Sequence, residues 1–158
     1  MMYTALNKNF EAAVRGSFER QELMKTISAK LTLVRPGEIE IEMPYRIKLT
    51  QQHGLIHAGI LTAVMDSACG YAALSLMPEK TEVLTVEYKV NFLSPGTGEW
   101  FKAKGRVLKA GATISVCAGN VVIPQKGGED VVATMLATMI SHQSQPLRRN
   151  KRSSGNDG

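Results

Sequence analysis

The sequence predicts an α+β domain in which one long central helix is wrapped by a roughly six-stranded antiparallel sheet. The first observation is an apolar run at residues 53–77, in which Asp66 is the only Asp, Glu, Lys or Arg. The second is that apolar and polar residues alternate before and after this run, with the period of two that is typical of strands. A sheet that buries one helix against a face is a layered α+β design.

Residues 58–77 predict a helix of about five turns, because the segment has many alanines and no proline before Pro78, which ends it. Its serines, glycines and Asp66 argue against a membrane-spanning helix. One face of the helix is a stripe of small residues, apart from Asp66 and the terminal Met77. The stripe consists of Gly59, Ala63, Asp66, Gly70, Ala73 and Met77. Small residues let another backbone approach closely, so we expect a close neighbour on this face.

The alternating segments predict six strands. Two of them, residues 30–35 and 38–43, are joined by the turn signal Pro36-Gly37 and predict a hairpin. After Pro78, apolar and polar residues alternate again. We expect this alternation to be uninterrupted in the next strand, residues 84–92. The remaining strands are expected at 101–107, 113–123 and 131–140. Short turns join the last four strands, so we expect each to be the antiparallel neighbour of the next.

The chain divides into three parts on this reading. Residues 1–29 form a helical segment packed on the domain, with one or two amphipathic helices that break at Gly16. Residues 30–142 form the domain itself. Residues 143–158 are polar and basic and predict a disordered tail.

Charge and cysteine content limit the function classes. The net charge is +5, and four basic residues and one aspartate in residues 147–158 supply +3 of it, which leaves +2 for the rest. A nucleic-acid binder would carry a basic patch on its folded part, so we exclude that class. The two cysteines, Cys69 and Cys117, suggest a reducing compartment without a disulfide framework. The first residues lack the apolar stretch of a signal peptide, so we expect a cytoplasmic protein.

Asp66 is the main candidate functional residue, because a lone carboxylate in an apolar helix costs free energy to bury. Two interpretations are open. It is either a structural aspartate that accepts hydrogen bonds from neighbouring backbone amides, or a functional carboxylate at a cleft or interface with its pKa set by burial. The N–H groups at the start of the helix, after His57, have no intrahelical acceptors and lie at the positive end of the dipole. They are suited to hold a carbonyl oxygen or a developing oxyanion.

His53 and His57 also raise the question of a metal site, because they are four residues apart. A zinc site needs a third protein ligand, and His142 is far away in the sequence. We therefore expect neither a metal nor a cofactor.

The order of a hairpin, a long helix and four long strands resembles the hotdog fold. The run His53, Gly54, His57, Gly59 and Asp66 is similar to the motif of the phenylacetate-type (PaaI-like) acyl-CoA thioesterases, N-x-x-G-x-x-H-G-G followed by six residues and Asp. The string VEYKVNFLSP at residues 86–95 resembles the third strand and following turn of that family. The resemblance covers residues 30–142 and implies an enzyme that hydrolyses acyl-CoA.

The resemblance implies a role for each matching residue. Asp66 corresponds to the carboxylate that activates water or attacks the thioester, and His57 to the histidine that orients the thioester and the departing thiol. The N–H groups of Ala58 and Gly59 correspond to the amides that polarise the thioester carbonyl. Thr85 corresponds to a Ser or Thr that positions water. The resemblance also implies a homodimer, or a homotetramer of two dimers, with each site between two subunits.

Two positions depart from the family pattern. Gln51 stands where the family usually has Asn, and it offers its amide one methylene further out. Ala58 stands where the family usually has the first Gly, and it keeps the N–H while adding a methyl group near the substrate. Neither departure removes the chemistry.

An acyl-CoA thioesterase is therefore the leading hypothesis, because a carboxylate base and amide donors are sufficient for acyl transfer to water. A non-catalytic acyl-CoA sensor on the same fold is the alternative, and a hydratase, which the order of Asp and His does not favour, is a third. We expect acyl-CoA and a second copy of the chain as partners, and no nucleic acid or membrane. Four basic residues are either partners of the CoA phosphates or part of a solvated sheet face: Lys89, Lys102, Lys104 and Arg106.

Overall fold

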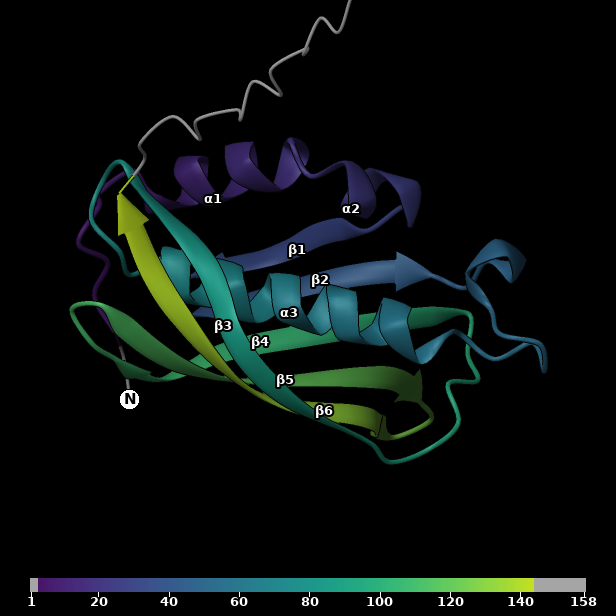
Figure 1. Cartoon of the computed structure of the whole chain (residues 1–158). Coiled ribbons are helices and arrows are strands. Elements are labelled where there is room, and N and C mark those ends of the chain that lie inside the picture. The colour runs from purple at the N-terminus through teal and green to yellow at the C-terminus, as the bar shows by residue number, and fades with distance from the viewer. Residues whose placement is uncertain (1–2, 144–158) are drawn as a thin grey trace, which may run out of the picture.

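The computed structural model describes residues 3–143, which form a six-stranded antiparallel sheet around one long helix (Figure 1). The helix is α3 (Ala58–Leu74), and the strand order is β1-β2-β4-β5-β6-β3. The strands are β1 (Lys30–Arg35), β2 (Glu38–Pro44), β3 (Thr81–Phe92), β4 (Trp100–Ala110), β5 (Ile114–Gln125) and β6 (Gly128–Gln143). The predicted hotdog architecture is confirmed. The predicted tail at residues 143–158 lies outside the described residues, apart from Gln143.

Strand β3 does not pair with β4, so the expectation that the last four strands are consecutive neighbours is wrong for this pair. Strand β3 pairs with β6 at one edge of the sheet, and β4 pairs with β2. The segment between β3 and β4 is not a tight hairpin turn, because the N–H of Leu93 donates to the carbonyl of Val132 and Gly96 is buried against Phe101. The chain therefore crosses the end of the sheet here.

A β-bulge interrupts β3 between Thr85 and Glu87, so the uninterrupted alternation expected for this strand is wrong. Thr85 lies opposite the buried Met139, and Tyr88 lies opposite the buried Ala137. A regular strand would place residues 85 and 88 on opposite faces, but the extra residue of the bulge puts both on the face toward α3.

Helix α3 ends at Leu74, three residues before the predicted end. The buried Ser75 forms the C-cap, where its hydroxyl donates to the carbonyl of Ala72 and accepts from the N–H of Gly37 in the β1–β2 turn, both over 2.7 Å. These bonds fix the C-terminal end of α3 to the hairpin. No helix within residues 3–143 combines the length and the apolar character needed to cross a membrane.

Strand β4 approaches the backbone of α3 closely at Gly105. A Cβ atom at Gly105 would lie 2.6 Å from the backbone nitrogen of Cys69 and would overlap the carbonyl group of Ala68. On the stripe, Gly70 faces Val83 of β3, and a Cβ there would make an ordinary contact of 3.9 Å. Gly105 therefore sets the distance between helix and sheet.

Two short helices, α1 (Phe10–Glu19) and α2 (Glu22–Thr26), lie beside α3 on the side of β1 (Figure 1). The predicted break at Gly16 is wrong, because Gly16 lies inside α1 and the helix continues to Glu19, with Arg20 as its C-cap. A single glycine costs a helix about 1 kcal/mol. Burial of Val14 and Phe18, on either side of it, offsets that cost.

Candidate active site

The carboxylate of Asp66 meets the hydroxyl of Thr85, from the bulge of β3, at the middle of α3. Thr85 Oγ1 donates to Asp66 Oδ1 over 2.7 Å. Within residues 3–143 this is the one hydrogen bond made by the Asp66 side chain, and no backbone amide donates to it. The interpretation of Asp66 as a structural aspartate required such amides, so the geometry favours a functional carboxylate.

The surroundings of Asp66 change its proton affinity. Burial raises the pKa of this carboxyl group above its ordinary value, because the charged form loses solvation. The hydrogen bond from Thr85 acts in the opposite direction and is the smaller effect. A carboxylate with a raised pKa accepts a proton more readily, which suits a general base.

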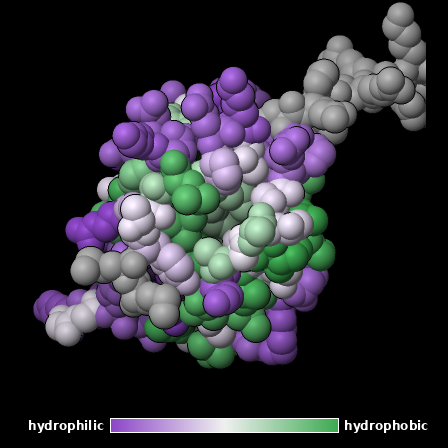
Figure 2. Space-filling model, turned by 90° about the vertical axis from the view of Figure 1, so that its left-hand side faces the viewer, coloured by the Kyte–Doolittle hydropathy of each residue, from purple (hydrophilic) through white to green (hydrophobic). Residues whose placement is uncertain are grey.

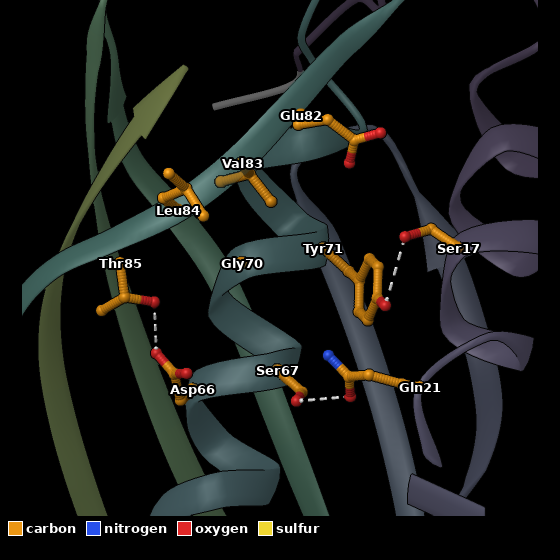
Figure 3. Close-up of a pocket in the computed structure, with 10 residues that line it drawn as sticks. All are labelled: Ser17, Gln21, Asp66, Ser67, Gly70, Tyr71, Glu82, Val83, Leu84 and Thr85. Carbon is orange, nitrogen blue, oxygen red and sulfur yellow. Dashed lines mark hydrogen bonds between the residues drawn. The ribbon is translucent and has the colours of Figure 1, made fainter. Parts of the chain in front are cut away.

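The pair lies in a cleft with a volume of about 220 Å³ between β3 on one side and α1 and α2 on the other (Figure 3). Helix α3 forms the floor with Asp66, Ser67, Gly70 and Tyr71. The sides are formed by Ser17, Gln21, Glu82, Val83, Leu84 and Thr85. The cleft is open to solvent, so a substrate can reach Asp66 from outside.

The start of α3 is capped by the side chain of His57. Its Nδ1 atom accepts the N–H of Gly59 over 2.9 Å, and its own backbone has the extended conformation of an N-cap. The N–H of Ala58 has no acceptor among the described residues. Residues 57–59 are exposed. Of the two predicted oxyanion donors, Ala58 is therefore free to bind a ligand, whereas Gly59 is occupied by His57.

Gln51 lies in the loop that precedes this helix start. Its side-chain oxygen accepts the N–H of His53, and its backbone N–H donates to the carbonyl of Leu55 over 2.9 Å. The side-chain oxygen therefore holds the loop in shape, and the amide nitrogen is the part of Gln51 that remains for a substrate.

Asp66 and the start of α3 are too far apart in one chain to act on the same carbonyl group. Asp66 lies nine positions after His57, which at about 1.5 Å per residue is about 13 Å along the helix axis. A carbonyl carbon must lie about 3–3.5 Å from its nucleophile, and its oxygen about 3 Å from its donors. One chain alone thus brings Asp66 and Thr85 together, but not Asp66 with His57, Ala58 and Gly59.

Sequence reasoning missed the part of the cleft that comes from the N-terminal helices. Ser67 donates to the side-chain oxygen of Gln21 over 3.1 Å, and the hydroxyls of Ser17 and Tyr71 lie 3.4 Å apart. Ser67 and Tyr71 could have been found, because they follow Asp66 on the same helix. Nothing in the sequence signals that Gln21 lines the same cleft as Asp66.

Two of the basic residues considered as partners of CoA phosphates form ion pairs within the chain. Lys102 lies 3.1 Å from Glu42 and 3.4 Å from Glu40 on the neighbouring strand, and Lys104 lies 2.5 Å from Glu129. These charges are compensated within the sheet, as expected for its solvated face.

The outer edge of the sheet beside the site exposes several large apolar side chains. Within residues 3–143, strand β3 has no neighbour on its far side. Four large side chains on it are about half exposed: Leu84 (56%), Val86 (54%), Tyr88 (47%) and Phe92 (50%). In the end-on view of Figure 2, hydrophobic residues gather around a central hollow and on the right-hand side, toward this edge, while hydrophilic residues cover the top, over α1.

Comparisons with known proteins agree with this architecture. Residues 53–129 match the family profile described as the thioesterase superfamily. A relative from Saccharolobus solfataricus named “Putative esterase” is 33% identical over 105 residues, which cover 66% of this chain and 74% of the relative.

Solved structures show the same fold over most of the chain. A thioesterase family protein from Silicibacter pomeroyi is 47% identical, with a TM-score of 0.83 and coverage of 85% of this chain and 99% of that protein. The PaaI protein from the phenylacetic acid degradation operon of E. coli is 18% identical, with a TM-score of 0.79 and coverage of 89% and 99%. The chain therefore belongs to the thioesterase superfamily and is a hydrolase with the hotdog fold.

Proposed function

We propose that the protein hydrolyses acyl-CoA thioesters to the free acid and CoA, and that Asp66 is the catalytic carboxylate. The observation that carries this proposal is the Thr85–Asp66 hydrogen bond, in an open cleft where burial raises the pKa of the carboxyl group. The names of the relatives support an esterase or thioesterase activity, and the PaaI-type motif supports CoA as the thiol.

Asp66 acts in one of two ways. As a base, it takes a proton from water while the water oxygen attacks the thioester carbon, and the proton then passes to the sulfur as the C–S bond breaks. As a nucleophile, it attacks the same carbon, releases the thiolate and forms an anhydride that water cleaves. In both routes Thr85 donates to Asp66, and the remaining lone pairs of its hydroxyl oxygen accept a hydrogen bond from water.

The oxyanion donors come from the start of α3 in this proposal. The N–H of Ala58 is free for a carbonyl oxygen, and the N–H of Gly59 becomes available when the ring of His57 turns toward the departing thiol. Gln51 lies in the loop just before the start of α3, and we propose that its amide nitrogen donates to the same carbonyl oxygen.

A second copy of the chain completes the site. The separation of about 13 Å along one helix prevents Asp66 and the helix start of the same chain from meeting one carbonyl group. The unpaired, apolar edge of β3 supports pairing with an identical edge, because such edges are normally covered. A two-fold axis there would bring the helix start of one chain to Asp66 of the other. Two such dimers would form the homotetramer.

The test is release of free thiol from a panel of acyl-CoAs of rising chain length, measured for the wild type and for Asp66→Asn. We expect the wild type to hydrolyse part of the panel and Asp66→Asn to lose about a hundredfold or more in kcat. Asp130→Asn, which removes an exposed carboxylate at the start of β6, is the matched control and keeps its activity. Tight acyl-CoA binding by the wild type without any turnover would overturn the proposal in favour of an acyl-CoA sensor.

A further inference from the structure

Gln21 reaches the cleft from the junction of α1 and α2, outside the residues that match the family profile. Its backbone is fixed at this junction, because its N–H donates to the carbonyl of Phe18 over 3.0 Å and its own carbonyl accepts the N–H of Met24 over 3.1 Å. Its side chain crosses to α3, where Ser67 donates to Oε1 over 3.1 Å. Gln21 and Asp66 line the same cleft, so the Gln21 amide faces the space that a molecule bound at Asp66 would occupy.

The two short helices form a fixed wall rather than a loose flap. Val14, Phe18, Met24 and Ile27 anchor them, with exposed fractions between 0 and 8%. The ring of Phe18 packs edge-on against the ring of Tyr71, with centroids 5.9 Å apart. Gln21 therefore keeps its position relative to α3.

The Gln21 amide has unused donor capacity on the cleft side. Ser67 occupies its oxygen, whereas its NH₂ group, with two N–H donors, has no acceptor within residues 3–143. Figure 3 shows this nitrogen turned away from the Ser67 hydroxyl, between Ser67 and Tyr71. An acceptor atom of a bound molecule can therefore accept a hydrogen bond from this NH₂ group.

The cleft presents several polar groups beside the apolar side chains of Val83 and Leu84. The hydroxyls of Ser17 and Tyr71 lie above Gln21 in Figure 3, and the carboxylate of Glu82 lies further along the cleft. A hydrocarbon chain placed here would remove water from these groups without replacing its hydrogen bonds, which costs free energy. A site built to hydrogen-bond a substrate group discriminates against the analogue that lacks it.

We propose that Gln21 is a specificity-determining residue that donates a hydrogen bond to an oxygen atom carried by the acyl group, beyond the thioester itself. The enzyme then prefers an oxygen-bearing acyl chain over the all-carbon chain of the same length. This inference rests on the proposed thioesterase function and adds the class of acyl group to it.

The experiment compares kcat/KM for three thioesters of equal chain length: octanoyl-CoA, 3-hydroxyoctanoyl-CoA and 8-hydroxyoctanoyl-CoA. We expect the wild type to prefer one hydroxylated ester over octanoyl-CoA by about five- to tenfold, as one hydrogen bond provides. Gln21→Leu, which has no donor, should bring that ratio close to one. Gln21→Glu keeps an oxygen for Ser67 but removes the NH₂ group, and should lower the ratio in the same direction.

Gln125→Leu, at the exposed end of β5, is the matched control and should keep the wild-type ratio. A wild-type ratio near one, or an equal ratio in the wild type and both Gln21 variants, would overturn the role of Gln21 and leave the thioesterase function standing. No hydrolysis of any ester by the wild type, in this panel and in the wider one, would instead overturn the proposed function itself.

Discussion

The hydroxyl of Thr85 donates a 2.7 Å hydrogen bond to the carboxylate of Asp66, and this bond connects the edge strand β3 to the central helix α3. Thr85 can reach Asp66 because of the bulge after it, which puts the side chains of both Thr85 and Tyr88 on the face of β3 toward α3. The bond favours the ionised form of Asp66, while burial disfavours it. In the proposed mechanism, the balance between these two effects sets the pH range in which Asp66 is ionised and able to act on the thioester.

Replacing Thr85 by Val should therefore move the acidic limb of the pH profile to higher pH. The variant keeps the shape of the side chain but loses the donor, so the pKa of Asp66 rises further above its ordinary value. The measurement is kcat/KM against pH for the thioester that the wild type hydrolyses best. Thr138→Val, which removes a donor to Glu87 on the outer face, is the matched control. A limb that stays in place or moves to lower pH would show that Thr85 does not act on the ionised form.

Asp66→Asn should stabilise the fold at neutral pH. Because burial raises the pKa of Asp66, the unfolded chain loses this proton at a lower pH than the folded chain does. The ionised carboxylate thus opposes folding, with no effect below its ordinary pKa and a growing effect as the pH rises through the raised pKa. Asn carries no charge, so the Tm of the variant should exceed that of the wild type at pH 7 and approach it at low pH. Thermal unfolding across that pH range tests this, with Asp130→Asn as the control; a gap that widens toward acid would contradict it.

The sequence was sufficient to predict the elements and the candidate carboxylate. The apolar run with Asp66, the hairpin around Gly37 and the alternating strands all depend on local patterns, and the structure confirms these elements. Strand order was harder, because the loop from β3 to β4 has the composition of a turn but crosses the end of the sheet. The bulge at Thr85 leaves no local signal either, since an extra residue in a strand is visible only against its partner on β6.

The remaining differences come from tertiary contacts. The side of the cleft that comes from the N-terminal helices exists because α1 and α2 dock onto α3 through Phe18 and Tyr71. This contact joins segments far apart in the chain, so no periodic pattern in the sequence predicts it. Burial of Val14 and Phe18 keeps α1 helical through Gly16. The sequence places the N–H groups of Ala58 and Gly59 on an equal footing, but in the structure the side chain of His57 accepts the N–H of Gly59 and, within residues 3–143, leaves only that of Ala58 free.

Gly105→Ala should destabilise the domain by about 1–3 kcal/mol or more, since overpacking costs this much even when the neighbours are side chains. Here the added methyl group would meet the backbone of Ala68 and Cys69 in α3, which cannot turn aside. The measurement is the free energy of unfolding in denaturant. Gly128→Ala is the matched control, because nothing lies within 4 Å of a Cβ there. Equal stabilities for the two variants would mean that α3 moves freely away from the sheet.

Mixing two inactive variants should restore activity if each site takes Asp66 from one chain and His57 from the other. Asp66→Ala and His57→Ala each damage both sites of their own dimer. A mixed dimer has one site with both residues intact and one with neither, so an equal mixture after subunit exchange should reach about a quarter of wild-type activity. Thiol release before and after co-refolding measures this, and two different affinity tags verify that mixed dimers have formed. Activity that stays at the mean of the two parents, with mixed dimers present, would place His57 and Asp66 in the same chain's site, in conflict with the separation of about 13 Å along α3.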